Sequence, residues 1–435
     1  MTDTALMTDR YELTMIDAAM RSGTAFRPSV FEVFARRLPG ARRYGVVAGT
    51  GRFLERLAEF RFGEAELASL RDNKVVSAEL LDWLADYRFT GDIRGYAEGE
   101  LYFPGSPILV VEGTFAEAVV LETVALSVLN YDSAVANAAT RMSRAAKGRP
   151  VAEMGSRRAN EEAAIAAARA AYIAGFSATS NLAAGSRWGI PTMGTAAHSF
   201  TLLHDSEAEA FQAQIDTLGV GTTLLVDTYD IEQGIRTAVE VAGTGLGGIR
   251  LDSGDLAEVA GEARLLLDSL GATETRITVT SDLDEYAIAG LQASPVDAYG
   301  VGTSVVTGSG APAAGMVYKL VARQGEDGEW VGVAKHSEDK ASKGGEKIAV
   351  RTIERGVATE ETVLLSVDGS VPADAAARGR ALQVPLVTGG TIDERWLRSG
   401  GVELARERHT ASVAELPADA HRLARGEPAI PTVFR

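Results

Sequence analysis

The stretch Gly248–Leu256, GIRLDSGDL, is the segment that decides the fold of this chain. Apolar residues at its second and fourth positions alternate with Arg250 and Asp252, which is the period of a short β-strand. The strand pattern then stops at turn-forming Ser, Gly and Asp. A guanidinium suits an anionic substrate, and a carboxylate beside it suits developing positive charge or a metal ion. Taken alone, the segment is better explained as the end of a surface strand with a solvated ion pair than as part of a site. The neighbouring segments therefore decide between these two interpretations.

Strand-like runs recur on both sides of this segment. Seven of them are Val151–Gly155, Phe176–Ser180, Thr192–Ala196, Thr222–Asp227, Gly248–Asp252, Ile277–Ser281 and Asp297–Ser304. Helix-compatible stretches separate most of these runs, and the alanine-rich Asn160–Ala174, closed by Gly175, is the clearest. Regular alternation of strands and helices predicts parallel strands with right-handed crossovers, in a barrel or in a doubly wound sheet.

Polar side chains gather where these runs end. In chain order the ends carry Arg157, Ser180, Thr195 with His198, Asp227, Arg250 with Asp252, Ser281 with Asp282, and Gly302 with Thr303. Ends that converge from so many runs fit a barrel with its active site on the carboxyl-terminal face, because a doubly wound sheet brings together only those at its switch point. The sequence therefore predicts an α/β fold with an irregular, incomplete TIM-like barrel of fewer than eight strands.

The two flanks of the chain differ from this middle part. The N-terminal flank holds strand-like pieces such as Tyr44–Ala48 and Ile108–Glu112, and strands and turns return from about Val331 onward. These patterns predict one β-rich accessory domain built from both chain ends. The expected domains are residues 1–120 with 331–435 for the accessory domain, and residues 121–330 for the catalytic barrel.

Composition and charge exclude several classes of binding partner and indicate where the protein is located. The formal net charge of −16, from 43 basic and 59 acidic residues, argues against binding to nucleic acid or to an anionic membrane. The chain has no cysteine, which excludes disulfides, zinc ribbons and thiol catalysis. The N-terminus is charged early and the apolar runs are interrupted by Glu and Arg, so we expect no secretory signal, no membrane span and a cytoplasmic location.

Eight motifs, in this order, resemble those of nicotinate phosphoribosyltransferases, which have the type II phosphoribosyltransferase fold. They are TDRYELTM (Thr8–Met15), EMGSRR (Glu153–Arg158), ATSN (Ala178–Asn181), GTAAHSF (Gly194–Phe200), VDTYD (Val226–Asp230), RLDSGD (Arg250–Asp255), SDLD (Ser281–Asp284) and GVGTS (Gly300–Ser304). The resemblance covers nearly the whole chain. It implies an ATP-coupled reaction of nicotinate with 5-phosphoribosyl pyrophosphate to nicotinate mononucleotide and pyrophosphate, the first step of nicotinate salvage into NAD.

The resemblance also implies catalytic roles. Asp252 would stabilise the oxocarbenium character that develops on the ribose as the C1–pyrophosphate bond breaks. Mg²⁺ would neutralise the leaving pyrophosphate, with no metal site made by protein ligands alone. His198 would accept the γ-phosphoryl group of ATP, and a carboxylate such as Asp227 would fix the tautomer of its imidazole.

The substrate-binding residues that the resemblance implies are Tyr11, Arg157, Ser180, Thr195, Arg250, Gly300, Gly302 and Thr303. The arginines would bind the nicotinate carboxylate and phosphates, and the glycine turn the 5′-phosphate. Tyr11 would stack on the pyridine ring from a partner subunit, which implies a homodimer. Related nicotinamide enzymes have Asp where Ser180 stands, so the serine hydroxyl would favour nicotinate.

Some positions depart from the family pattern. Met154 stands where Phe is common, which gives a softer wall to the base pocket. The Lys-rich loop Lys335–Lys347 resembles a phosphate-contacting segment, but Gly344 replaces the usual Pro. Some relatives carry a cysteine-ligated zinc, which this chain cannot hold.

Other functions stay open on the same fold. A quinolinate phosphoribosyltransferase decarboxylates its substrate without ATP, and would need more basic residues and no histidine in GTAAHSF. A nicotinamide phosphoribosyltransferase would have Asp where this chain has Ser180. A non-catalytic nucleotide-binding relative would keep the scaffold, although the intact catalytic candidates speak against it.

Overall fold

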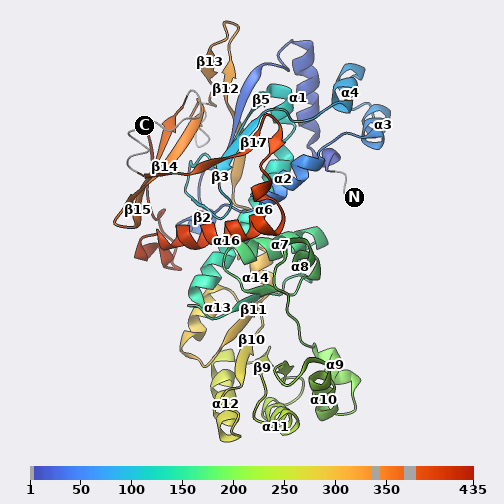
Figure 1. Cartoon of the computed structure of the whole chain (residues 1–435), viewed down its shortest axis with the longest axis vertical. Helices are drawn as coiled ribbons and strands as arrows, with labels where there is room; N and C mark the ends of the chain where they lie inside the picture. The colour runs from blue at the N-terminus through green and yellow to red at the C-terminus, as the bar shows by residue number, and fades with distance from the viewer. Residues whose placement is uncertain (1–3, 336–342, 367–378) are drawn as a thin grey trace. The chain divides into compact units, whose positions relative to one another are not determined.

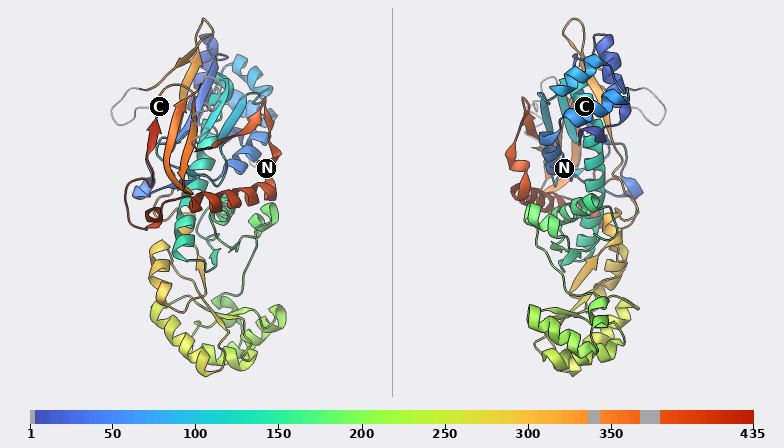
Figure 2. Two further views of the ribbon diagram at one scale, coloured as in Figure 1. Left: turned by 60° about the vertical axis from the view of Figure 1, so that its left-hand side comes forward. Right: turned by 90° about the vertical axis from the view of Figure 1, so that its right-hand side faces the viewer.

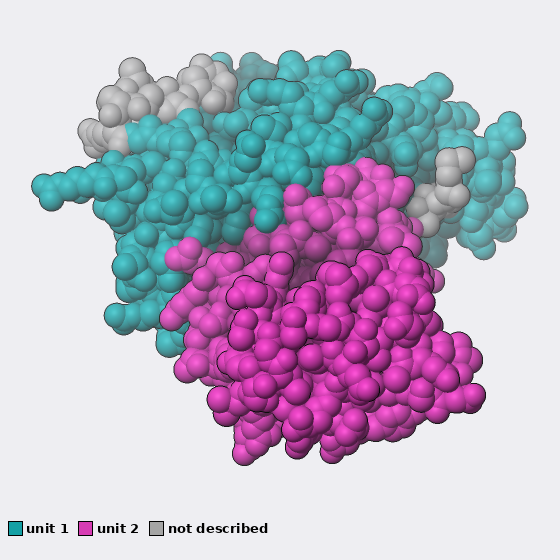
Figure 3. Space-filling model, turned by 60° about the horizontal axis from the view of Figure 1, so that its bottom comes forward, with its two compact units in different colours: residues 1–137, 311–435 teal, residues 138–310 magenta. Residues whose placement is uncertain are grey.

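A computed structural model describes residues 4–335, 343–366 and 379–435 of the chain (Figure 1). The chain divides into two compact units. Met1–Asn137 with Ala311–Arg435 form the first, and Ala138–Gly310 the second (Figure 3). The expected domains have boundaries near residues 120 and 330. Whether those domains fold independently is a separate question, so these boundaries stay a prediction.

The second unit is built on one sheet of six parallel strands. In sheet order these are β7 (Ala178–Thr179), β6 (Val151–Glu153), β11 (Ala298–Val301), β10 (Arg276–Val279), β9 (Gly248–Leu251) and β8 (Thr223–Leu225). Ile249 and Leu251 are fully buried while Arg250 between them is half-buried, as the alternation predicts. The edge strands β7 and β8 are not neighbours in the sheet, so the barrel is incomplete, which confirms the expected fold class.

Helices connect these strands, and Figure 2 shows their succession in green and yellow from two further sides. They are α7 (Glu161–Ile173), α8 (Leu182–Trp188), α9 (His198–Leu203), α10 (Glu207–Leu218), α11 (Ile231–Ala242), α12 (Leu256–Ser269), α13 (Glu285–Gly290) and α14 (Thr303–Val306), with the short η3 (Leu291–Ala293). Asn181, Asp230 and Asp255 each cap the helix that follows, because their side chains accept backbone N–H groups of its first turn. These caps anchor the loops that leave the carboxyl ends of the strands.

One expected strand was wrong. In the described part of the chain, Thr192–Ala196 contributes only an isolated bridge between Thr192 and Thr179. Pro191 has no backbone donor and Gly194 costs more entropy to order than other residues, so the segment forms a loop instead of a strand.

The first unit contains a large sheet to which both chain ends contribute. Its strands, in order, are β13 (Trp330–Gly332), β12 (Met316–Gln324), β1 (Pro28–Ala35), β5 (Leu109–Thr114), β3 (Asp92–Tyr96), β17 (Gln383–Thr388) and β18 (Thr391–Ile392). A second sheet holds β16 (Gly379–Ala381), β14 (Lys347–Glu354), β15 (Val357–Leu365) and β19 (Thr432–Phe434), and β2 (Gly45–Val46) pairs with β4 (Leu101–Tyr102). The pairing of β3 with β17 joins the two flanks and confirms the β-rich accessory part, whereas β12, which pairs with β1, comes from the range that was expected to belong to the barrel.

The first unit also contains helices where the sequence analysis expected only strands and turns. They are α1 (Arg10–Arg21), α2 (Thr50–Glu59), α3 (Glu64–Asp72), α4 (Ala78–Ala85), α5 (Phe115–Val119), the start of α6 (Glu122–Ala145) and α16 (Arg398–Ala414), with the 3-10 turns η1 (Ala5–Met7), η2 (Pro39–Ala41), η4 (Glu394–Trp396) and η5 (Ala418–His421). In α1, the buried residues Leu13, Ile16 and Ala19 recur every third position, a helical period that the sequence analysis missed.

One helical stretch, residues 115–145, is long and apolar enough by length and composition to cross a membrane. The sequence analysis overlooked this stretch. Of its most apolar window, 67% is buried inside the protein. Leu121, Ala125 and Leu129 of this stretch belong to the hydrophobic core of the first unit, which is the position of a core helix.

Candidate active site

A pocket of about 260 Å³ lies at the carboxyl ends of the neighbouring strands β6, β11, β10 and β9. It is lined by Met154, Arg157, Arg158, Arg250, Asp252, Thr280, Ser281, Asp282, Gly300, Gly302 and Thr303. Six predicted site residues are among them: Arg157, Arg250, Asp252, Gly300, Gly302 and Thr303. Three arginines in so small a pocket favour a ligand with anionic groups.

Arg250 extends from β9 and holds a loop of the site in place. Its Nη1 donates to the hydroxyl of Thr195 at 3.2 Å, and its Nη2 donates to the carbonyl of Ala196 at 3.0 Å. Burial lowers the pKa of the Arg250 guanidinium from its ordinary value, and the nearby carboxylates of Asp252 and Asp227 oppose this shift. Two residues predicted to bind substrate, Thr195 and Arg250, therefore bind each other.

Asp227 and Asp252 follow neighbouring strands and are tied together. Asp227 is buried, and its Oδ2 accepts the backbone N–H of Asp252 at 2.7 Å and the hydroxyl of Ser253 at 2.9 Å. Oδ1 of Asp252 accepts a hydrogen bond from the Thr280 hydroxyl. One carboxylate oxygen of each residue is thus held by the protein, and Oδ1 of Asp227 has no hydrogen-bond partner among the described residues.

His198 is the first residue of α9 and faces both of these carboxylates. Its Nε2 lies 4.0 Å from Oδ1 of Asp227 and 3.9 Å from Oδ2 of Asp252. Its Nδ1 lies 3.1 Å from the hydroxyl of Thr228. The expectation that Asp227 fixes the imidazole tautomer was therefore wrong, since 4.0 Å exceeds hydrogen-bond distance and Thr228 makes the bond.

Gly300 was expected in a turn with Gly302 and Thr303, but it lies inside β11, where it pairs with Ala152, and only Gly302 and Thr303 follow the strand. A Cβ on Gly300 would lie 2.5 Å from Cγ2 of Thr280 and 2.7 Å from Sδ of Met154, so only glycine fits there. Ser281, across the pocket, has a φ of 139°, a conformation that is strained for a residue with a side chain. Backbone strain of this kind gathers at functional sites, which agrees with the placement of Ser281 in the pocket.

Sequence reasoning missed three residues of the site, Arg158, Thr228 and Thr280, whereas it named Met154 as a wall of the base pocket, and Met154 does line this pocket. A local signal existed for each of the three. Thr228 follows Asp227 directly, Arg158 follows Arg157, and Thr280 precedes the Ser-Asp pair at the end of β10. Polar residues adjacent to a predicted site residue at a strand end were good candidates for supporting contacts.

Other predicted residues lie outside this pocket. Ser180 is exposed at the end of β7 and is not among the lining residues. Tyr11 belongs to the first unit, on α1, and is 45% exposed. Burial of its hydroxyl and the neighbouring Glu122 carboxylate raise the pKa of Tyr11 above its ordinary value. In the Lys335–Lys347 loop, residues 336–342 lie outside the described residues.

Within the described residues, no three His, Asp or Glu side chains gather into a ready-made metal site. The orphaned Oδ1 of buried Asp227 and the nearby Oδ2 of Asp252 nonetheless suit a hard cation. Mg²⁺ binds through one or two carboxylates and completes its shell with water and phosphate oxygens. The residues therefore fit a magnesium ion that is shared with a phosphorylated substrate.

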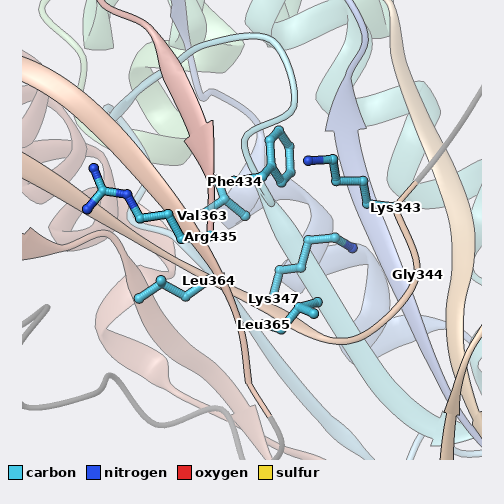
Figure 4. A pocket seen from close by; sticks show the side chains of 8 residues that line it. All are labelled: Lys343, Gly344, Lys347, Val363, Leu364, Leu365, Phe434 and Arg435. Carbon is cyan, nitrogen blue, oxygen red and sulfur yellow. The ribbon is translucent and has the colours of Figure 1, made fainter.

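A second pocket, of about 200 Å³, lies in the first unit against β15 and β19 (Figure 4). Its cationic side chains already have partners. Lys347 binds Glu32 at 3.1 Å, Arg435 binds Glu360 at 2.9 Å, and Lys343 lies 3.8 Å from the ring centre of Phe434. We assign no function to this pocket.

An open parallel barrel whose strand ends present arginines, two carboxylates and a glycine turn, with a histidine from the start of α9 beside the carboxylates, is typical of an enzyme for anionic substrates. Residues 6–130 match the family model described as the nicotinate phosphoribosyltransferase N-terminal domain. The chain is 55% identical over 441 residues to nicotinate phosphoribosyltransferase pncB1 of Mycobacterium tuberculosis (strain CDC 1551 / Oshkosh), covering 98% of this chain and 94% of that protein. It is 39% identical over 360 residues to nicotinate phosphoribosyltransferase of Bacillus subtilis (strain 168), covering 80% of this chain and 73% of the other.

Among solved structures, human nicotinic acid phosphoribosyltransferase has the same fold. The TM-score is 0.78 at 24% identity, over 98% of this chain and 97% of the human chain. The chain therefore belongs to the nicotinate phosphoribosyltransferase family, and it is an enzyme.

Proposed function

We propose that this enzyme condenses nicotinate with 5-phosphoribosyl pyrophosphate to give nicotinate mononucleotide and pyrophosphate, in the salvage of nicotinate into NAD. The observation that carries the proposal is the pocket in which Arg157, Arg250 and Asp252 converge with the glycine turn at the strand ends. Membership of the family supports the choice of substrates.

The reaction needs a group that stabilises positive charge on the ribose. The ring nitrogen of nicotinate forms a bond to C1 as the C1–oxygen bond breaks and its electron pair leaves with pyrophosphate. Asp252 suits this task, since Thr280 holds Oδ1 and Oδ2 remains directed toward His198. A fixed carboxylate close to the developing oxocarbenium ion stabilises it without reorganisation.

Anionic groups of the substrates are bound by the remaining pocket residues. Arg157 and Arg158 are exposed at the end of β6, and their guanidinium groups suit the nicotinate carboxylate or phosphates. Gly302 and Thr303 offer backbone N–H groups and a hydroxyl for the 5′-phosphate. Asp227 and Asp252 would hold Mg²⁺ together with phosphate oxygens, and the bound ion would neutralise charge on the leaving pyrophosphate.

His198 is proposed to couple ATP hydrolysis to this reaction: a ring nitrogen accepts the γ-phosphoryl group as ADP leaves, and water later takes that group from the histidine as phosphate. Its side chain is 41% exposed, so a nucleotide can reach it, and two carboxylates lie about 4 Å from Nε2. The Thr228 hydroxyl, 3.1 Å from Nδ1, orients the ring, and Nε2 faces the site as the candidate nucleophile.

A homodimer with Tyr11 acting across the interface belongs to the same proposal. Tyr11 and Met15 are 45% and 38% exposed, and their spacing of four residues places them on one side of α1, while Met7, which is 65% exposed, ends the preceding turn η1. An apolar stripe of this kind suits burial against a second copy of the chain. The proposed use of ATP and 5-phosphoribosyl pyrophosphate goes with a cytoplasmic location.

A product assay tests the proposal directly. The protein is incubated with 5-phosphoribosyl pyrophosphate, Mg²⁺ and nicotinate, nicotinamide or quinolinate, each with and without ATP. We expect nicotinate mononucleotide from nicotinate alone, formed faster with ATP. Product from quinolinate, or no product from any base, would contradict the proposal.

A variant separates the coupling from the condensation. His198→Ala should abolish stimulation by ATP while some ATP-independent synthesis remains, because the phosphoryl acceptor is lost and the pocket is intact. His204→Ala is the matched control, since His204 directly follows α9 and its Nδ1 lies 2.8 Å from the carbonyl oxygen of Phe200. Loss of all activity in a folded His198→Ala protein would assign His198 to the chemical step instead.

A further inference from the structure

We infer that Glu153, the last residue of β6, is a positioning residue that holds the loops of Arg157 and Ser180 in one arrangement. Strand β6 lies between β7 and β11, and the Glu153 side chain is completely buried at its end. Burying a carboxylate is costly unless hydrogen bonds offset the loss of water. The contacts of this carboxylate therefore indicate what it does.

Both oxygens of Glu153 bind residues of the strand-end loops. Oε1 accepts the backbone N–H of Gly155, and Oε2 accepts the Thr179 hydroxyl at 2.6 Å. The Thr179 hydroxyl in turn accepts the backbone N–H of Asn181 at 3.0 Å. The side-chain amide of Asn181 donates to the hydroxyl of Ser156 at 3.0 Å. These bonds close a ring that joins the loop after β6 to the loop after β7.

The ring contacts the predicted binding residues at their backbone. Ser180 donates its N–H to the backbone carbonyl of Glu153 at 2.8 Å, and Arg157 follows Ser156 of the ring directly. Gly155 also abuts the glycine turn, because a Cβ on it would lie 2.9 Å from the carbonyl of Gly302. Glu153 thus links the base-recognising and anion-binding parts of the site, an inference that rests on the proposed function.

The Glu153→Gln variant tests this role with little change of shape. A glutamine offers one acceptor and one donor, so it can keep the bond from Gly155 N–H only if its amide donates to the Thr179 hydroxyl, which reverses that bond of the ring and leaves the buried hydroxyl proton of Thr179 without its acceptor. We expect the KM for nicotinate to rise by roughly ten-fold, with a smaller change in kcat. The preference for nicotinate over nicotinamide should fall as well, which a merely structural role would not produce.

Variants of Thr179 complete the test. Thr179→Val removes the hydroxyl and should reproduce the effect of Glu153→Gln, and the double variant should add little to either change. Thr179→Ser keeps the hydroxyl and should stay close to the wild type. Glu285→Gln is the matched control, since Glu285 is a buried carboxylate of the same unit that binds Arg141 and Ser309 away from this ring. It should alter stability and leave KM and base preference unchanged.

The outcomes distinguish the inference from the proposed function. A folded Glu153→Gln protein with wild-type KM and base preference overturns the role of Glu153. Absence of nicotinate mononucleotide with the wild type overturns the proposed function instead. The ring is then tested by hydrogen exchange, where Glu153→Gln should lose protection at the Gly155 and Asn181 amides and unchanged protection would overturn it.

Discussion

Each unit of this enzyme contains a cluster of arginines and carboxylates, and the two clusters are arranged in opposite ways. In the first unit, Arg351 is buried, and its guanidinium donates to Glu100 and Glu361 at 2.6 Å each. Burial alone would raise the pKa of Glu100, but Arg351 and Arg380 lower it to about 2. In the second unit, Asp227 and Asp252 face the imidazole of His198, and Arg250 turns to a loop.

The difference lies in where each charge finds its partner. Opposite charges in the first unit meet inside the protein at hydrogen-bond distance, which holds distant parts of the chain together. In the second unit, Oδ1 of Asp227 has no hydrogen-bond partner among the described residues, and the side chain of Asp252 is 40% exposed. Charges left partly uncompensated at strand ends are available to a substrate or a metal ion. The same residue types thus stabilise one unit and are chemically available in the other.

Arg351→Met should give the largest effect and should change stability. The substitution leaves Glu100 and Glu361 buried without their shared partner, so we expect a loss of about 3–5 kcal/mol in the free energy of unfolding. Chemical denaturation followed by circular dichroism measures it. Arg21→Met, which removes an exposed ion pair with Asp17 in the same unit, should cost less than about 1 kcal/mol. Equal losses for the two variants would contradict the comparison.

Asp252→Asn should change turnover instead. Asparagine can still accept the hydrogen bond from Thr280 through its carbonyl, but it lacks the charge that stabilises the oxocarbenium ion. We expect kcat to fall by about 10²–10³-fold, with a change in the free energy of unfolding below about 1 kcal/mol. Steady-state kinetics and denaturation measure the two quantities. Asp268→Asn, on exposed helix surface, should keep wild-type kcat. A stability loss like that of Arg351→Met would show that Asp252 is structural.

Ser180→Asp tests whether Ser180 of the second unit selects nicotinate over nicotinamide. An added carboxylate would repel nicotinate and accept hydrogen bonds from the amide of nicotinamide. We expect the ratio of kcat/KM for nicotinate over nicotinamide to fall by roughly ten-fold. Ser186→Asp, at an exposed position of α8 just after the same strand, adds the same charge and should leave the ratio unchanged. If both ratios stay at the wild-type value, Ser180 does not select the base.

Glu12→Gln should give the smallest effect, a change in the pH dependence of stability. Burial raises the pKa of Glu12 to about 8, while hydrogen bonds from Thr123 oppose the shift. Because the folded pKa is above the unfolded one, stability from this group is complete at low pH and is lost as pH rises through 8. Between pH 7 and pH 9 the wild type should lose about 1 kcal/mol more than Glu12→Gln. Parallel curves for the two proteins would show that Glu12 is ionised throughout.

The carboxyl ends of the parallel strands were predictable from the sequence. Short apolar runs that end in Arg250, Asp252 or Gly302 mark both the strand and the polar group that follows it. The segment after Pro191 failed as a strand because proline and glycine weaken pairing even where β-type residues are present. The helical period of α1 was visible but was not used.

The supporting contacts were not predictable in the same way. Thr228 lies at hydrogen-bond distance from His198, and Thr280 holds Asp252, although each pair is far apart in the chain. Hydrogen bonding depends on differences of less than 1 Å, which residue types and spacing do not determine.

The sequence by itself determined the kind of fold, the family and the residue types at the strand ends, because periodicity, turn residues and motifs are local properties of the chain. Only the tertiary structure decided which of these groups meet. It brought Asp227 and Asp252 to one side of His198, turned Arg250 toward Thr195, and buried Glu153 between two loops. The physical reason is that strand order and side-chain packing set the distances between residues far apart in sequence, and those distances govern electrostatic and hydrogen-bond energies.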